Sequence, residues 1–265
     1  MAEELKRYDS DGLVIIDKDF HTHTVYSHGK GTVRDNVERA RELGLSTIAI
    51  TDHGIGHYVV GVSRAHLIEE KKEIERVQAD YPTVKILFGI ESDILGMSGK
   101  TDLSPEDAEM FDIVLCGYHK PVLWDKWSDI PRLHYNAYSH YFYKPTAKQI
   151  ANNTEAYINT ITKNKIDILT HPGYHLKIDC YEVAKACSEY GTVMEISTRH
   201  QDMTDEDYEA MLKTDVMFAI NSDAHKIENI ANVTRAKEVV KKYGIPADRI
   251  VNAVGTEYTM RTRRK

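Results

Sequence analysis

The sequence predicts an α/β fold, a parallel barrel of seven strands, and two observations carry the prediction. Seven short apolar runs alternate with amphipathic helical segments, a pattern typical of a parallel sheet with crossover helices. Each run also ends within a few residues of a histidine or an acid. Side chains at the carboxyl ends of parallel strands meet at one mouth of a barrel, so we expect a metal centre there. A chain of 265 residues fits a single domain, 1–265, with its core at about 14–255.

Each strand is predicted from a run of mostly aliphatic residues bounded by polar segments. The seven runs lie at 14–17, 47–50, 86–90, 113–116, 166–169, 193–196 and 216–220. The side chains at or near their ends are, in the same order, His21 with His23, Asp52 with His53, Glu91, His119, His171, Glu195, and Asp223 with His225. One such ending carries little weight, but seven in the same relation to a strand indicate a shared site.

Helices are predicted between these strands from apolar spacing and from capping residues. Their ranges are 32–43, 63–79, 146–163, 179–190, 204–213 and 227–242. The first opens at a candidate N-cap, Thr32, and stops at Gly44. A further helix starts at Ser104, where a capping residue precedes a first-turn proline and two acids.

Two segments stand outside the alternation of strands and helices. The insertion at 120–145 is rich in aromatic residues and follows His119, so its base lies on the same face as the expected centre. A wall or lid that stacks on a substrate ring, a subunit contact and simple packing are all open for it. A basic tail follows at 256–265, and its last part, Arg261-Thr-Arg-Arg-Lys265, is expected to be solvated.

Composition excludes several classes of protein. The formal charge of −7 and the pI near 6.0 argue against a broad basic face, so no stable nucleic-acid partner is expected. The sequence contains no apolar run long enough to span a membrane. Its first residues are charged and unlike a signal peptide, so a cytoplasmic location is expected. The three cysteines form no close pair, and we expect them to be reduced, with Cys116 in the core.

The histidines and acids at the strand ends are suited to binding metal. His21 and His23 alternate along an extended segment, so both can point to one side and bind one ion. Asp223 and His225 repeat this arrangement. The whole set offers more ligands than one ion uses, which predicts two or three divalent ions. Zinc, manganese and iron all accept such a mixture of imidazole and carboxylate.

Short motifs carry a resemblance to a known family. The motifs are His21-Thr-His23, His28-Gly29, Thr51-Asp52-His53-Gly54, Gly89-Ile-Glu91, Gly117-Tyr-His119, Thr170-His171-Pro172-Gly173 and Asn221-Ser-Asp223-Ala-His225. In this order, from about Asp17 to His225, the chain resembles the PHP (polymerase and histidinol phosphatase) family. It is most similar to the stand-alone bacterial branch with a trinuclear metal site. The resemblance implies a distorted seven-stranded (β/α) barrel of the TIM type and metal-dependent phosphoesterase activity.

The resemblance also implies how the metal ligands divide. All nine ligand positions of the family are filled, by seven histidines, Glu91 and Asp223. The first ion would be held by His21, His23, Glu91 and Asp223, the second by Glu91, His119 and His171, and the third by His28, His53 and His225. Glu91 would bridge the first two ions. His28 lies in a glycine-containing loop, and the family pattern alone includes it.

The predicted reaction is hydrolysis of a small phosphorylated substrate by a metal-activated hydroxide, without a covalent enzyme intermediate. The catalytic candidates are Glu91, Asp223, Glu195 and Arg199. Glu195 could orient a ligand or a water molecule, and Arg199 could bind the substrate phosphate. Further candidates for contacts in or near the site are Lys120 for phosphate, Asp52 for a neighbouring ligand, and His57, His175 and His200 for the pocket wall.

Several alternatives stay open at this point. Histidinol phosphate is one candidate substrate, but nothing in the chain selects it. The family also contains polymerase-associated members, so a nucleotide phosphatase or nuclease is a second enzyme of the same class. A non-catalytic metal-binding module belongs to a different class, and C–N hydrolysis of the amidohydrolase type is a lesser alternative. A homo-oligomer is compatible with the sequence.

Overall fold

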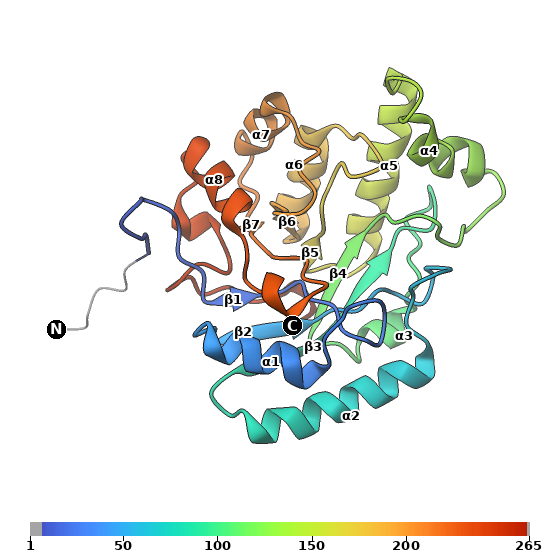
Figure 1. The fold of residues 1–265 in the computed structure, drawn as a ribbon. Coiled ribbons are helices and arrows are strands. Elements are labelled where there is room, and N and C mark those ends of the chain that lie inside the picture. Colours follow the sequence, from blue (N-terminus) through green and yellow to red (C-terminus); the bar gives the residue numbers. More distant parts are fainter. Residues whose placement is uncertain (1–6, 264–265) are drawn as a thin grey trace.

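The computed structural model describes residues 7–263 and contains seven parallel strands hydrogen-bonded in chain order in one curled sheet (Figure 1). Helices alternate with the strands, as the sequence predicted. The strands are β1 (Lys18–Asp19), β2 (Thr47–Ile50), β3 (Lys85–Asp93), β4 (Ile113–Gly117), β5 (Ile168–Leu169), β6 (Val193–Glu195) and β7 (Phe218–Ala219). The predicted distorted (β/α) barrel is confirmed.

Most of the helices begin where the sequence placed a capping residue. The α-helices are α1 (Val33–Glu42), α2 (Arg64–Asp80), α3 (Pro105–Ala108), α4 (Asn136–Ser139), α5 (Ala147–Lys163), α6 (Cys180–Tyr190), α7 (Asp205–Leu212) and α8 (Thr234–Lys242). Thr32 and Thr146 each form a capping box with the third helical residue, which satisfies two otherwise unpaired backbone donors. No helix among the described residues has the length and apolar character needed to cross a membrane.

Two hydrophobic cores lie on opposite faces of the sheet. Alternate residues of each strand point to the same face, and one such set packs inside the curl: Phe20, Ala49, Leu87, Ile113, Leu115, Ile168, Val193, Ala219 and Val251. The other set packs against the helices, as Ile48 and Phe88 do with α1 and α2 residues. Cys116 belongs to this outer core and is fully buried, as predicted. The inner core fills the barrel below the mouth where the polar side chains gather.

The barrel closes through side chains and a later segment rather than through a ladder between its first and last strands. Among the described residues the strand ladder ends at β1 and β7. Asn252 spans this gap, because its amide donates to the carbonyl oxygens of Lys18 (3.1 Å) and Ile220 (2.6 Å). Nearer the mouth, a parallel bridge joins Thr22 to Ala224. We call this junction the seam of the barrel.

Several residues of the basic tail contact the rest of the barrel. Tyr258 and Met260 pack against the inner core, and the Tyr258 hydroxyl donates to the Gly191 carbonyl oxygen at 2.9 Å. The Thr262 N–H and hydroxyl donate to the buried carboxylate of Asp167 at 2.8 and 2.9 Å. Within the range predicted to be solvated, Arg261 and Thr262 are half-buried, and the Arg261 guanidinium donates to the Ile161 carbonyl oxygen at 2.8 Å. The prediction was therefore wrong for these two residues; residues 264–265 lie outside the described part.

Two predicted elements are displaced. The apolar run at 14–17 is not β1, because Val14 forms an antiparallel bridge with Tyr8 and Ile16 forms one with Ala253; the strand begins at Lys18. The last predicted helix, 227–242, begins only at Thr234, after a 3₁₀ turn at Ile227–Asn229. Ala231 interrupts it at a φ of 57°, where its N–H donates to the buried Asp19 carboxylate at 2.9 Å.

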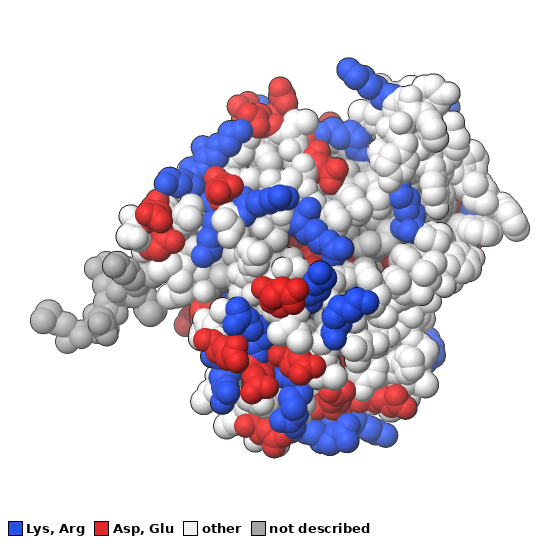
Figure 2. Space-filling model, in the orientation of Figure 1, with Lys and Arg blue, Asp and Glu red and all other residues white. Residues whose placement is uncertain are grey.

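The aromatic insertion lies between β4 and α5 and contains a π-helical turn (Ile130–His134) followed by α4. Many of its large side chains are exposed; Trp127 and Phe142 have relative exposures of 77% and 78%. Figure 2 shows that the surface around α4 is largely free of charge, whereas the surface over α2 is covered with mixed charges. Packing inside the domain therefore does not account for these exposed side chains.

Candidate metal centre

Glu91, inside β3, stands at the centre of the polar cluster at the mouth of the barrel. It is fully buried. Five imidazole nitrogens lie within 3.6 Å of its carboxylate oxygens: Nε2 of His21 (3.2 Å), His119 (3.5 Å) and His171 (2.9 Å) face Oε1, and Nδ1 of His53 (3.0 Å) and Nε2 of His23 (3.6 Å) face Oε2. The two oxygens therefore face two different sets of imidazoles, an arrangement in which the carboxylate could be shared between cations.

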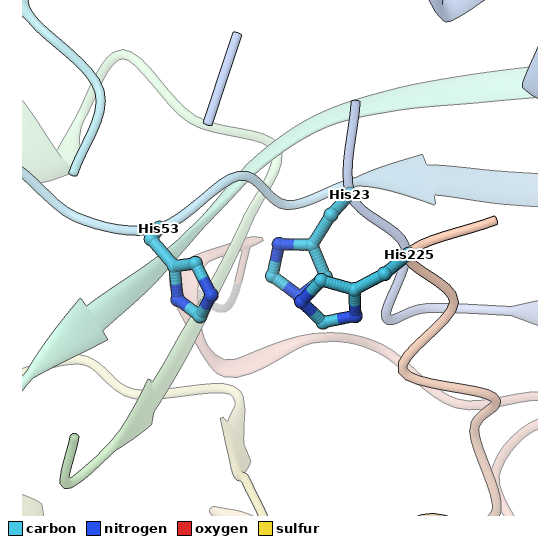
Figure 3. Close-up of side chains that lie close together, drawn as sticks. All are labelled: His23, His53 and His225. Carbon is cyan, nitrogen blue, oxygen red and sulfur yellow. The ribbon is translucent and has the colours of Figure 1, made fainter. Parts of the chain in front are cut away.

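Asp223 organises the opposite side of the cluster. Its Oδ1 lies 3.3 Å from His23 Nε2 and 3.3 Å from His225 Nδ1. Figure 3 shows the rings of His23, His53 and His225 turned toward one another from separate segments of the chain, with centroids 4.4 and 4.2 Å from His23 to the other two. The ring of His28 packs on His53 and His225 at 4.9 and 4.1 Å. The structure thus brings all nine candidate ligands together.

Glycine explains how His28 reaches this cluster from a loop. A Cβ on Gly29 would lie 2.5 Å from the carbonyl oxygen of His23, so only glycine allows the loop to fold this closely onto the first ligand segment. Asp52 holds the same loop, since it accepts a hydrogen bond from the Thr24 N–H at 2.7 Å and contacts the Ser27 hydroxyl. It lies 3.9 Å from His23 Nδ1, beyond hydrogen-bonding distance, so its main contacts are with the loop rather than with a candidate ligand.

The donor atoms of the cluster fit divalent ions. Three groups have ligand atoms within 4.8 Å of one another: His23 with His53 and His225, His21 with His23 and Asp223, and His53 with Glu91 and His119. Several of these buried atoms lack a hydrogen-bond partner among the described residues, including His21 Nε2, both ring nitrogens of His23, and Glu91 Oε2. Burying polar atoms without partners is costly, and cations at these positions would satisfy them.

The protonation states differ between the candidate ligands. Burial acts to lower the pKa values of His21 and His119, but Glu91 and the other nearby carboxylates raise both above the usual value, that of His119 to about 9, so these two rings would release a proton on binding a metal. Burial acts to raise the pKa of Glu91, but the imidazoles of His21 and His119 hold it well below its usual range, so the carboxylate is ionised. Burial lowers the pKa of His28 to about 3 and that of His225 to about 4, with neighbouring imidazoles contributing. These two rings are therefore neutral near pH 7 and carry free lone pairs, as metal ligation requires.

Two buried carboxylates behind the cluster fix the orientation of candidate ligands. Glu195 Oε1 lies 2.9 Å from His21 Nδ1, and its Oε2 accepts the His171 N–H at 2.8 Å. Asp93 Oδ1 lies 2.8 Å from His119 Nδ1. In each pair the Nδ1 proton faces the carboxylate, which leaves Nε2, on the Glu91 side, as the nitrogen that would bind a cation. The sequence analysis included Glu195 but missed Asp93, although its position two residues after Glu91 places both side chains on the same face of β3.

The backbone is strained at two of the candidate ligands. His171 and Asp223 have φ values of 26° and 48°, in the region that usually requires glycine. Such conformations cost roughly 1–3 kcal/mol each and persist where surrounding contacts impose them. For His171 that contact is the hydrogen bond from its N–H to Glu195. This backbone conformation turns both side chains into the cluster.

A pocket of about 310 Å³ opens in front of the cluster. Its wall includes His57, His175 and His200, which the sequence named as candidates, together with Lys120 and Arg199. The Arg199 guanidinium contacts His225 and lies 3.5 Å from Asp223 Oδ1, so this exposed side chain stands at the rim of the pocket beside the candidate ligands. Tyr174 also lines the pocket, stacked on the His200 ring at 3.8 Å; the sequence analysis did not single it out.

Glu70, on α2, is a buried acid behind Asp52. Its side chain has no solvent exposure, and burial, with the nearby carboxylates of Asp52 and Glu73, raises its pKa well above the usual value near 4.5. The folded protein therefore keeps a proton on Glu70 that the unfolded chain releases. Stability from this group is complete below about pH 4.5 and declines as the pH rises toward the folded-state pKa.

Replacing Glu70→Gln should remove that decline. We expect the free energy of unfolding of the variant, relative to the unmodified protein, to increase by about 1.4 kcal/mol per pH unit above pH 5. Urea unfolding of both proteins at pH 5, 6 and 7 measures this difference. Glu69→Gln, on the exposed side of the same helix, is the matched control. Parallel pH curves for the Glu70→Gln variant and the unmodified protein would contradict a raised pKa.

Comparison with known proteins agrees with the fold. The family model of the PHP domain matches residues 19–222. A protein of Shewanella baltica named "Probable phosphatase" is 30% identical over 244 residues, covering 88% of this chain and 85% of its own, and one of Proteus mirabilis named "Probable phosphatase PMI1003" is 28% identical, covering 88% and 89%.

Among solved structures, histidinol phosphate phosphatase from Lactococcus lactis, complexed with zinc, L-histidinol and phosphate, has the same fold. Its TM-score is 0.61, over 88% of this chain and 95% of that chain, at 16% sequence identity. At that identity the likeness concerns the fold alone. The family match spans most of the barrel and includes seven of the nine candidate ligands in full sequence order. The chain therefore belongs to the PHP domain family.

Proposed function

We propose that this protein is a metal-dependent phosphatase that hydrolyses a small phosphorylated substrate at the mouth of its barrel. The observation that carries the proposal is the central position of Glu91, whose two buried carboxylate oxygens face different sets of imidazoles and could be shared between cations. The relatives named as probable phosphatases support a phosphoric ester as the substrate. The pocket volume of about 310 Å³ suits a metabolite rather than a polymer.

The proposed centre contains two or three divalent ions, of zinc, manganese or iron. His21, His23, Glu91 and Asp223 would hold the first, and Glu91, His119 and His171 the second. His28, His53 and His225 would hold the third; His53 Nδ1, 3.0 Å from Glu91 Oε2, lies between the second and third groups. When bound, such ions supply Lewis-acid chemistry and lower the pKa of a water molecule that they bind to about 7.

The protein's own residues would then position the substrate. Arg199 lies beside Asp223 and His225 with its guanidinium at the pocket wall, where it can donate two hydrogen bonds to a phosphate. His57 Nδ1 accepts the N–H groups of Val59 and Val60, both at 3.2 Å. This leaves His57 with a proton on Nε2 and makes it a fixed hydrogen-bond donor in the pocket. Positioning and charge neutralisation are the main contributions that phosphoryl transfer needs from a protein.

Metal analysis of the purified protein, paired with phosphate release from a panel of phosphoesters, tests the proposal. The panel includes sugar phosphates, deoxynucleotides and histidinol phosphate, so it also separates a metabolite phosphatase from a nucleotide phosphatase. We expect chelation to abolish phosphate release and re-addition of one of the three metals to restore it. A phosphoenzyme trapped during turnover would contradict direct hydrolysis. A metal-loaded protein inactive on every ester would favour the non-catalytic module.

A further inference from the structure

Lys120 stands at the edge of the pocket in an unusual setting. It follows the candidate ligand His119 and is half-buried at the pocket wall. The aromatic insertion fixes its ammonium group: Nζ donates to the carbonyl oxygen of Ala137 at 2.7 Å and to the Tyr141 hydroxyl at 2.8 Å. The same nitrogen lies 4.1 Å from the centre of the Tyr141 ring. A lysine ammonium has three N–H donors, so one remains after these two hydrogen bonds.

The Lys120 ammonium group contacts neutral oxygens and forms no ion pair with an acid in the part of the chain that the structure describes. Among the described residues, no carboxylate oxygen lies within 4.0 Å of its Nζ. Lys177, by contrast, forms an ion pair with Asp207. The residues that line the pocket include one acid, Asp223, and it faces the candidate ligands. A cation that is oriented by neutral oxygens and open to a pocket is suited to binding an anion from outside the protein.

A row of aromatic rings connects Lys120 to the metal cluster. His200 Nε2 lies 3.4 Å from Asp223 Oδ2, and from His200 the ring contacts pass to Tyr174, His175, His140 and Tyr141, with successive centroids 3.8, 3.7, 6.1 and 4.1 Å apart. These rings form one wall between the proposed site of hydrolysis and the ammonium group. They give a substrate an aromatic surface along which its leaving group can lie.

We propose that Lys120 is a second anion subsite, so that the preferred substrate has an anionic group, a phosphate or a carboxylate, in addition to the phosphate that is hydrolysed. The inference rests on the proposed function, because it places the scissile phosphate at the candidate metal centre. The aromatic insertion then positions the Lys120 ammonium group of this subsite, through the Ala137 carbonyl oxygen and the Tyr141 hydroxyl. A leaving group with a positively charged amine, as in histidinol, would meet the like charge of Lys120 and bind poorly.

Calorimetric binding of non-hydrolysable ligands to the metal-loaded protein tests this subsite without turnover. The probes are alkane bisphosphonates of increasing chain length and the alkyl phosphonate of each length. At one chain length we expect the bisphosphonate to bind about 10- to 100-fold more tightly than its single-headed partner, the range for one hydrogen bond to a charged group. Lys120→Gln should abolish that advantage, and Lys120→Arg should retain most of it. Lys126→Gln, at an exposed lysine of the same insertion, should leave it intact.

The outcomes separate the inference from the proposed function. Equal binding of bisphosphonates and phosphonates at every length overturns the inference. An equal loss for both ligands in the Lys120→Gln and Lys120→Arg variants also overturns it, because Lys120 would then support the pocket as a whole. A protein that shows the expected preference yet hydrolyses no ester would retain the subsite and disprove the phosphatase. Comparing bisphosphonates with ω-carboxyalkyl phosphonates identifies whether a phosphate or a carboxylate is preferred.

Discussion

Glu91→Gln should lose most of its bound metal and reduce kcat/KM for any phosphoester substrate by about 10³-fold or more. The substitution keeps the shape of the side chain but replaces one of two ligand oxygens by an amide nitrogen that cannot bind a cation. Because Oε1 and Oε2 face different imidazole groups, the change affects both sides of the bridge. Losing several kcal/mol of charge stabilisation from a metal centre corresponds to a rate loss of this size.

Metal content by mass spectrometry, measured beside steady-state kinetics, checks this result. Glu75→Gln, at an exposed position on α2, is the control for the loss of one negative charge, and it should match the unmodified protein in both measurements. Excess metal should not restore the Glu91→Gln variant, since the bridging ligand itself is absent. Full metal content with undiminished activity would mean that the centre lies elsewhere.

Glu195→Gln should weaken metal binding by about 10- to 100-fold, the range for partners that orient a ligand. Glu195 accepts hydrogen bonds on both oxygens, from Asn221 and the His21 ring at Oε1 and from the His171 N–H at Oε2. A glutamine has one oxygen and one NH₂ group at these positions, so one of the two ligands loses its acceptor. Where the amide oxygen keeps the His21 and Asn221 hydrogen bonds, His171 loses the contact that holds its strained backbone.

Metal titration distinguishes this positioning role from direct catalysis. We expect the Glu195→Gln variant to regain most of its activity when metal is in excess, unlike the Glu91→Gln variant. Glu189→Gln, exposed on α6, is the matched control and should titrate as the unmodified protein does. A Glu195→Gln variant that binds metal normally but hydrolyses slowly would instead make Glu195 a catalytic residue.

The alternation of strands and helices was predictable because burial imposes it on the sequence. The β2 bounds were correct to the residue, since Thr47–Ile50 is buried throughout. The first strand was misplaced because Val14 and Ile16 are as apolar as strand residues but bridge other segments at the edge of the domain. The course of the basic tail was hidden for a different reason: Tyr258 and Met260 meet the inner core, and short-range periodicity contains no information about such long-range contacts.

The candidate site was predictable where ligands stand at strand ends. His28 needed the family pattern, because its approach depends on the close backbone contact at Gly29. Asp93 was missed since an acid in a strand has no signature that separates a ligand's partner from a salt bridge. The contacts of Lys120 could not be predicted at all, because they depend on how a loop of exposed aromatic residues folds over itself.

The seam of the barrel has a consequence for the order of folding. Its two sides come from β1 and β7, and the Asp19 and Ser222 side chains that meet across it are 203 residues apart in the chain; Asn252 arrives later still. Contacts between such distant segments are slow to form, because the entropy of closing the loop is lost first. His21 and Asp223 stand on opposite sides of the seam, with 3.8 Å between His21 Nε2 and Asp223 Oδ1. An ion held by both residues would link the two sides of the seam, so metal uptake would complete the fold as well as the active site.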